Sequence, residues 1–552
     1  MIRYSLRRFR FSLGLGSAVS AMLLALLGLF IAQLIWISEP DMGLFQSLNL
    51  RDWQIVKFTF LQAGLSTFLS LILGAAVAWS LHHQPRFFGR TLLIALFSSA
   101  LVLPTLVVVL GLVSVLGRNG WLNTLLQHMF GHSLGPFLYG FAGILIAHVY
   151  LNASFVVRSF LNRFDAIPME KRKLVRSLGL STWQRFKLIE WPAIRSAIPA
   201  TGITIFLLCF TSFAIVLTLG GSPSYNTLEV AIYEAVRFDF DIARALDLAL
   251  LQLIICAALV FPLISIKNLT NIISPRVLEM PWEEPSLTKR VQWSLITGAA
   301  LGFILPLCAV IYDGLGANFV RLFSEPTTVQ ALVTSVIIAF VSSLTTLALA
   351  LSICASKRNF TLKLRLGSMS LAPLFNAVQS FSAMLYLAFP ALVMGLSFYL
   401  VARHLPGSIN LWAVVALLTA NTLMALPFAI AVLSPAMEKS AGRYDRLTFS
   451  LGVSRLNRWR LVEWPLLRSE IGYVCSIGFC FSLGDLGVIA LFGNQDFVTL
   501  PWLLYQKFGS YRTNDAAGIA LIMLVLTLTV FLLVPKLFAA KSQSSGHPNA
   551  AH

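Results

Sequence analysis

The chain has 552 residues, of which 57% are hydrophobic and only 12% are charged, and its mean hydropathy is +0.80. Soluble domains carry about 25% charged residues, so this composition excludes an ordinary soluble protein. The net charge of +18 does not indicate nucleic-acid binding, because Lys and Arg accumulate in the cytoplasmic loops of membrane proteins. We therefore predict an all-α polytopic membrane protein that lies in the lipid bilayer and has no nucleic-acid partner.

The first predicted element is a membrane span near the N-terminus. The basic segment MIRYSLRRFR precedes an apolar run at residues 12–38. Cleavable signal peptides have an apolar core of only about 7–15 residues, so we interpret this longer run as a retained span. Eleven further runs are long enough to cross a hydrocarbon core about 30 Å thick as helices. They fall near residues 56–81, 91–116, 139–162, 197–219, 245–267, 294–314, 329–355, 368–401, 411–436, 471–492 and 515–538.

The distribution of Lys and Arg supports these twelve spans. When the N-terminus and every second loop are assigned to the cytoplasm, those segments carry 32 of the 41 Lys and Arg residues. This excess follows the positive-inside rule, and an even number of spans places both termini in the cytoplasm. The adjacent His82 and His83 fall at the edge of one short loop, where we expect a structural role.

A polar, basic segment occurs twice. Residues 177–196 read SLGLSTWQRFKLIEWPAIRS, and residues 450–469 read SLGVSRLNRWRLVEWPLLRS. Eleven of the twenty positions are identical at a constant offset of 273. Both copies are predicted on the cytoplasmic side and are separated by six spans, so the halves that contain them have the same orientation. A surface that occurs twice predicts a partner that is also present twice.

The repeat predicts the domain organisation. We expect two pseudo-symmetric halves of about six spans each, related by an axis along the membrane normal. The first half covers residues 1–270 with its loop at 164–196, and the second covers 294–542 with its loop at 438–469. A cytoplasmic linker at 271–293 joins them, and a disordered tail follows at 543–552.

The two halves also resemble each other on the predicted outer side, at residues 218–245 and 490–517. The apolar run at 227–236 is too short to span a bilayer. We expect it to lie at the membrane interface as a short amphipathic helix. It would serve there either as an anchor or as a docking rim for an external partner.

Each basic segment combines a turn with a short helix that has an apolar tip and basic flanks. Glycine permits backbone turns that other residues resist, so two short helices should meet at Gly179 and at Gly452. Basic and aromatic residues follow each glycine, a composition that suits a groove on another protein. Pro192 and Pro465 suit the first turn of the next helix. Contact with anionic lipid is the alternative function of such loops.

Asp485 is the acidic residue that lies well inside a predicted span. An ionisable residue at membrane depth is a functional candidate, although it could also pair with a neighbouring donor and only stabilise the bundle. The chain contains no G-x-x-x-x-G-K-[ST] motif for ATP and no metal-spaced cluster. We therefore expect no cofactor, no metal and no enzymatic activity in this chain.

The two loops resemble the cytoplasmic EAA loop of ABC-importer permeases. In that loop a glycine is followed at fixed spacing by an apolar residue and then by Leu-Pro. Here the pattern is Gly179, Ile189 and Trp191-Pro192 in the first copy, and Gly452, Val462 and Trp464-Pro465 in the second. The three EAA positions differ, because they read KLV at 173–175 and RLT at 446–448. The ion pair that the family makes through that glutamate is therefore not expected here.

Further stretches in both halves are similar to the fused twelve-span permeases of thiamine and thiamine pyrophosphate importers, which are related to ferric-iron permeases. They are VKFTFLQAGLS (56–66), GRNGWLNTLLQ (117–127), FLLCFTSFAIVLTLGG (206–221), LGDLGVIALFGNQDF (483–497) and LYQKFGSYRTNDAA (504–517). The resemblance implies a type I ABC permease fold in a bacterial inner membrane. It also implies two copies of a cytoplasmic ATPase and one periplasmic thiamine-binding protein as partners.

The resemblance assigns roles to particular residues. The segments that couple to the ATPase would contain Leu178, Gly179, Glu190, Trp191 and Pro192, and likewise Leu451, Gly452, Glu463, Trp464 and Pro465. On a substrate pathway, Asp485 would offset the cost of passing the cationic thiazolium ring of thiamine.

Other functions are weighed against this one. A ferric-iron permease is the nearest alternative, because the binding protein sets most of the specificity. An ion-coupled secondary transporter also has twelve spans, but it needs several ionisable groups within them. In this sequence Asp485 is essentially the single ionisable group within the predicted spans. An intramembrane enzyme would need a metal cluster or a Ser/His arrangement. Free thiamine and its phosphates remain equal as candidate ligands.

Overall fold

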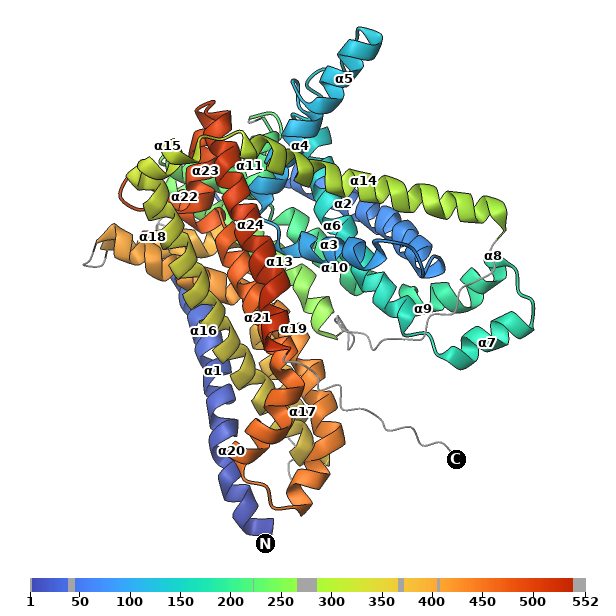
Figure 1. Cartoon of the computed structure of the whole chain (residues 1–552). Helices are drawn as coiled ribbons and strands as arrows, with labels where there is room; N and C mark the ends of the chain where they lie inside the picture. Colours follow the sequence, from blue (N-terminus) through green and yellow to red (C-terminus); the bar gives the residue numbers. More distant parts are fainter. Residues whose placement is uncertain are drawn as a thin grey trace.

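The computed structural model describes residues 2–37, 45–221, 223–265, 285–365, 372–404 and 408–539. We refer to α1–α13 as the N-terminal set and to α14–α24 as the C-terminal set (Figure 1). The N-terminal set contains α1 (Ile2–Ile37), α2 (Leu50–His83), α3 (Arg90–Ser99), η1 (Ala100–Val102), α4 (Thr105–Leu116), α5 (Trp121–Phe130), α6 (Phe141–Asp165), α7 (Met169–Ser177), α8 (Thr182–Arg185), η2 (Phe186–Glu190), α9 (Trp191–Arg195), α10 (Ile198–Phe210), α11 (Ala214–Leu219), α12 (Leu228–Arg237) and α13 (Ile242–Ser265). The C-terminal set contains α14 (Ser286–Leu315), α15 (Phe319–Ser324), α16 (Pro326–Arg365), α17 (Ala372–Met384), η3 (Leu385–Ala388), α18 (Ala391–His404), α19 (Ile409–Ser450), α20 (Arg455–Arg458), η4 (Trp459–Glu463), α21 (Trp464–Gly484), α22 (Gly487–Phe492), α23 (Leu500–Gly509) and α24 (Thr513–Phe538). Most of the predicted linker at 271–293 and all of the predicted tail at 543–552 lie outside the described residues.

The helices confirm a polytopic all-α membrane protein. Within the described residues, ten helices are long and apolar enough to cross a membrane, and the number is twelve if each of two bent pairs counts as one span. One bent pair falls in the over-long apolar run at 368–401, where Phe375–Ala388 and Ala391–Arg403 meet at 87°. Pro390 lies at this bend, and it has no N–H with which to continue the preceding helix.

The apolar run at 91–116 is divided into two helices. α3 ends at Ser99, η1 follows, and α4 begins at Thr105 directly after Pro104. The continuous apolar segment in this region instead runs from Thr105 to Phe130, over α4 and α5. The prediction of one span at 91–116 therefore misplaced it, because Pro104 interrupts the helix.

The same succession of short helices occurs in both sets. At the offset of 273 residues, α8 corresponds to α20, η2 to η4, and α11 to α22, with identical bounds. α12 and α13 correspond in the same way to α23 and α24, within two residues. The repeat therefore extends beyond the loops into the helices that follow them.

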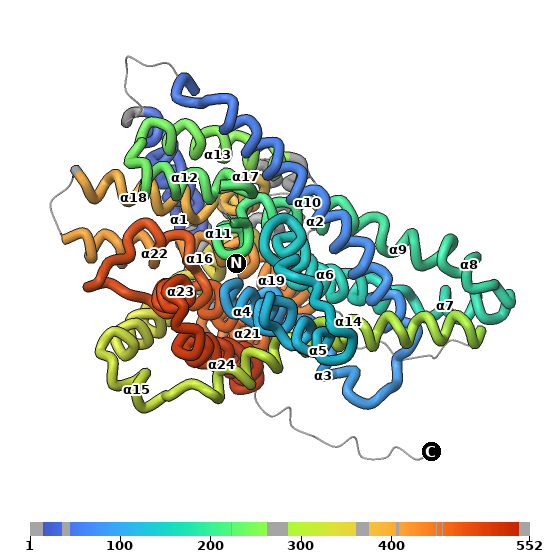
Figure 2. Tube along the Cα trace, turned by 90° about the horizontal axis from the view of Figure 1, so that it is seen from above, coloured from blue at the N-terminus to red at the C-terminus, as the bar shows by residue number. Residues whose placement is uncertain are grey.

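Each set contributes its first helix to the other set. α1 packs against α16 and α17, whereas α14 packs against α2 and α4. Figures 1 and 2 accordingly show α1 beside the C-terminal helices and α14 beside the N-terminal ones. Both contacts are close at a glycine. A Cβ atom on Gly16 would lie 2.3 Å from Cβ of Ser356, and one on Gly111 would lie 2.5 Å from the carbonyl oxygen of Pro306, so only glycine fits.

α12 is enclosed by other helices. Every residue from Leu228 to Val236 except Glu234 is buried, and α12 packs against α2, α13, α18 and α22. The prediction of a short helix at 227–236 is confirmed, but the helix is buried instead of exposed as an anchor or a docking rim. The segment is too short to span, but it is covered by protein on all sides.

Candidate functional site

Each loop turns at a glycine with a left-handed backbone. Gly179 has φ of +60° and Gly452 has φ of +59°, a conformation that is strained for residues with a side chain. In the first loop, the following helix α8 starts with a capping box. The Ser181 side chain accepts a hydrogen bond from the Gln184 N–H, and the Gln184 side chain accepts one from the Ser181 N–H. Two short helices, α7 and α8, therefore meet at Gly179, as the sequence predicted. At Gly452 the short helix α20 instead follows α19, which has 42 residues, so the prediction of two short helices is wrong for the second loop.

Exposed apolar side chains recur at the same offset in both loops. Leu178 is 62% exposed and Leu451 is 68% exposed. Three more pairs, in which every residue is more than half exposed, are Leu174 with Leu447, Trp183 with Leu456, and Leu188 with Leu461. We call these eight residues the apolar loop faces. Large apolar side chains that gather on an exposed surface are typical of an interaction site.

A widened helical turn precedes each Trp-Pro pair. The N–H of Trp191 bonds to the carbonyl oxygen of Phe186, five residues earlier, and the N–H of Trp464 bonds to that of Trp459 in the same way. The proline that follows each tryptophan has no N–H. The change from the usual four-residue hydrogen bond to a five-residue one therefore leaves no additional N–H without a partner at this point. The loops thus share the turn at their end as well as the glycine at their start.

A buried carboxylate holds the first loop against α2. Glu190 is 1% exposed, and its Oε1 accepts hydrogen bonds from Nε2 of His83 at 3.0 Å and from Nε of Arg185 at 2.9 Å. Its Oε2 accepts a hydrogen bond from Nε1 of Trp79 at 2.8 Å. His83 and Trp79 belong to α2, so this carboxylate fixes the loop to the end of a membrane-spanning helix.

Glu463 holds the second loop through a charged network. Arg358, from α16, donates to Oε1 of Glu463 and to Oδ1 of Asp445. Arg458 lies 2.8 Å from the same Oε1 and 3.1 Å from the same Oδ1. Two guanidinium groups and two carboxylates therefore join α16, α19 and the loop. Charge-assisted hydrogen bonds of this kind are stronger than neutral ones.

The predicted loop residues separate into accessible and internal ones. Leu178 and Leu451 belong to the apolar loop faces. Trp191 is 41% exposed and Trp464 is 40% exposed. Glu190 is internal, and the side chain of Glu463 is only 13% exposed.

The sequence did not reveal the partners of the two glutamates. Arg185 and Arg458 are among the basic residues that follow each glycine and were expected to suit a groove on another protein, but in the structure they bind Glu190 and Glu463. Each arginine precedes its glutamate by five residues in both copies, and this spacing was the available signal. Nothing in the spacing pointed to Arg358 on α16.

Asp485 lies between α21 and α22. Its Oδ1 accepts a hydrogen bond from the N–H of Gly487 at 3.1 Å, so the carboxylate closes a local turn just before α22. Its Oδ2 is buried and has no partner among the described residues. Local pairing therefore accounts for one of the two carboxylate oxygens.

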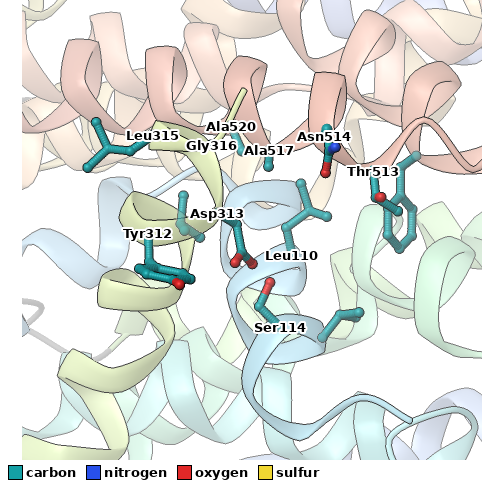
Figure 3. A pocket seen from close by; sticks show the side chains of 13 residues that line it. Leu110, Ser114, Tyr312, Asp313, Leu315, Gly316, Thr513, Asn514, Ala517 and Ala520 are labelled. Atoms are coloured by element: carbon teal, nitrogen blue, oxygen red, sulfur yellow. The ribbon is translucent and has the colours of Figure 1, made fainter. Parts of the chain in front are cut away.

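A cavity of about 720 Å³ lies between α4, α14, α23 and α24. Its polar lining includes Ser114, Asp313, Thr513 and Asn514, and Figure 3 shows Ser114 and Asp313 pointing toward the same space. The cavity is near the start of α24, whereas Phe538 at the end of α24 contacts Trp464 of the second loop. It therefore lies at the end of the bundle opposite the loops.

The fold and the loops match known transport proteins. A family model described as "Binding-protein-dependent transport system inner membrane component" matches residues 70–279, which include the first loop. The chain is 39% identical over 500 residues to the thiamine transport system permease protein ThiP of Brucella abortus (strain 2308), covering 89% of each chain. The chain belongs to the family of binding-protein-dependent transport permeases. It is accordingly an inner-membrane component of a transport system and has the polytopic fold of a type I ABC permease.

Other permeases of this family show how the match is distributed. The thiamine transport system permease protein ThiP of Escherichia coli (strain K12) is 38% identical over 529 residues, 94% of this chain and 95% of its own. The molybdenum transport system permease protein ModB of Azotobacter vinelandii is 29% identical over 186 residues, which are 80% of its own length but 34% of this chain. A shorter permease thus corresponds to one part of this chain.

Proposed function

We propose that this chain is the permease subunit of an ABC importer for thiamine and its phosphates. The identity to thiamine permeases over almost the whole length supports this substrate, because the similarity is not confined to the loops that permeases share. A periplasmic thiamine-binding protein delivers the ligand. The permease passes it through the membrane between two halves, residues 1–270 and 294–542, which the linker 271–293 joins.

Two copies of a cytoplasmic ATPase bind the two loops in this proposal. The observation that carries it is the apolar loop faces, whose four residue pairs are exposed in both loops at one offset. A partner with two equivalent grooves would cover them. The Lys and Arg distribution supports placing the loops and both termini in the cytoplasm of a bacterium.

The buried glutamates explain how such a partner would drive the permease. Glu190 and Glu463 fix the loops to α2 and α16. Because these contacts are internal, a displacement of the docked loop is passed to the attached helix rather than absorbed by a flexible connection. The energy source is the ATPase, and this chain needs no nucleotide site.

The coupling role is tested by placing charge on the loop faces. In a Leu178→Asp, Leu451→Asp double variant, we expect the permease to insert and to keep its melting temperature, because both side chains are exposed. Binding of the partner ATPase should fall by at least about tenfold, since a charge in an apolar groove stays unpaired. Val320→Asp is the matched control, because Val320 is 82% exposed on α15, away from the loops. Normal ATPase binding by the double variant would contradict the proposal.

The substrate is tested through the binding protein that works with this permease. We expect thiamine or a thiamine phosphate in its cleft after purification, identified by mass spectrometry. Uptake of labelled thiamine by proteoliposomes that contain the permease and ATPase should require that protein. Bound iron without thiamine would instead identify a ferric-iron importer and would leave the coupling role intact.

A further inference from the structure

Both sets of helices are interrupted at the same place. α10 ends at Phe210 and α11 begins at Ala214, while α21 ends at Gly484 and α22 begins at Gly487. The two interruptions coincide at the offset of 273. Each leads to a further short helix, α12 or α23. In membrane transporters, interrupted segments at corresponding positions of two halves are a guide to the substrate site.

α12 places a carboxyl group beside this region. Glu229, in its first turn, is 1% exposed. Its Oε1 accepts a hydrogen bond from Nε2 of Gln252 at 2.9 Å, whereas its Oε2 has no partner among the described residues. Gln252 is fully buried, and its Oε1 also has no partner in that part of the chain. Burying acceptors without donors is unfavourable, so their retention suggests a ligand.

Asp485 reaches the same region from the C-terminal set. α12 packs against α18 and α22, and Nη2 of Arg237 on α12 donates to the carbonyl oxygen of Gly493 at the end of α22, at 3.1 Å. Asp485 bonds to the first residue of α22, so it lies beside the helix that α12 contacts. Burial, with a smaller contribution from the charge of Asp485, raises the pKa of Glu229 to about 8. Among the residues that the structure describes, neither forms an ion pair with Lys or Arg. Figure 2 shows α12 next to α18.

The chemistry of this cluster determines the charge of the ligand that it can bind. Glu229, Gln252 and Asp485 present three acceptor oxygens that receive no hydrogen bond, and two of the groups are acids. Such a set favours a positively charged group over a negatively charged one. We propose that these residues form a cation site on the transport pathway, with carboxyl groups from both halves.

The proposed cation site rests on the proposed function and names the residues that would hold the thiazolium ring of its substrate. The thiazolium nitrogen of thiamine carries a permanent positive charge and has no proton to donate. Carboxyl groups around it offset the cost of removing that charge from water. Because one acid comes from each half, the site is complete only while α12 and α22 remain together. A movement that separates the halves therefore divides the site and releases the cation.

The test uses the reconstituted complex of permease, ATPase and binding protein in proteoliposomes, with labelled thiamine and labelled thiamine pyrophosphate as probes. In the Glu229→Gln, Asp485→Asn double variant, we expect thiamine uptake to fall by about tenfold or more, the effect of losing contacts to charged groups. Uptake of the pyrophosphate should fall much less, because its phosphate charges outweigh the thiazolium charge. Glu234→Gln is the control, since Glu234 is a half-buried acid on the same helix.

The melting temperature separates a transport role from a structural one. Removal of buried, unpaired carboxylates should leave the melting temperature unchanged or raise it, whereas the loss of a structural contact would lower it. Wild-type thiamine uptake by the double variant would overturn the cation site, and so would equal losses for both probes. If the wild-type complex moved neither probe, the proposed function itself would fail.

Discussion

Replacement of Glu190 by glutamine tests whether one buried carboxylate holds the first loop to α2. Glu190 accepts hydrogen bonds from Trp79, His83 and Arg185. Glutamine has nearly the same shape but no charge, so Arg185, whose side chain is only 4% exposed, loses its counter-charge. Removing one partner of a buried ion pair costs about 3–5 kcal/mol. The variant should therefore weaken the attachment of the loop by that amount.

The cost falls on the contact between the loop and α2, because all four groups lie at that end of the helix. A change of about 3–5 kcal/mol raises the opening equilibrium by about two to four orders of magnitude. Hydrogen–deuterium exchange of the amides at 182–195, measured in nanodiscs, should accelerate by that factor where exchange follows the opening equilibrium. The amides of α24 should exchange as in the wild type.

Two further variants make this measurement decisive. Glu170→Gln is the matched control, since Glu170 is an exposed glutamate in the same loop. Glu190→Gln combined with Arg185→Gln removes both charges and should recover part of the protection, because no unpaired charge stays buried. Unchanged exchange at 182–195 in Glu190→Gln would refute the reasoning, as would an equal acceleration in the Glu170→Gln control.

Two other perturbations have defined outcomes. At Gly179 and Gly452, an added Cβ meets nothing within 4 Å, so only the backbone conformation opposes a substitution. Valine should cost about 1–3 kcal/mol of backbone strain. Asparagine tolerates positive φ and should preserve the loop fold. Valine should therefore lower ATPase-driven uptake while the permease inserts, whereas asparagine should largely keep it. Normal uptake with tryptophan at both positions would disprove the coupling role. The Lys507 ammonium, hydrogen-bonded to Glu325, lowers the pKa of that carboxyl group, so the pair stabilises the fold above the unfolded pKa of about 4.3 and this stability is lost as the pH falls below it. The melting temperature should drop as the pH falls from about 5 towards the lowered pKa of the folded state, less steeply in Lys507→Met, and identical profiles for the two proteins would exclude this contribution.

The sequence was sufficient for features that are local or repeated. Apolar run length predicted the spans, because a membrane-spanning helix must bury about twenty residues in hydrocarbon. The turns at Gly179 and Gly452 were predictable because only the local backbone conformation decides them. The family was predictable from the loops, since their spacing is preserved even though the three EAA positions differ.

Features that depend on contacts between distant helices were not predictable. The run at 227–236 was expected at the membrane interface because it is too short to span. Its burial results from α13, α18 and α22, which no pattern within the segment records. For the same reason the sequence did not single out Glu229, and only the structure shows that this acid is buried.

The anchors of the loops show the same limit in a repeated element. At the offset of 273, Arg172 corresponds to Asp445, which has the opposite charge. In the second half, the guanidinium group of Arg358 balances the charge of Asp445. The residue of the first half that corresponds to Arg358 is Pro85, which has no charge. The first loop is instead held by His83. Because one unpaired buried charge costs about 3–5 kcal/mol, a change at one position is tolerated only when another helix compensates for it. The loops are therefore equivalent on their exposed side and different on the side that faces the bundle.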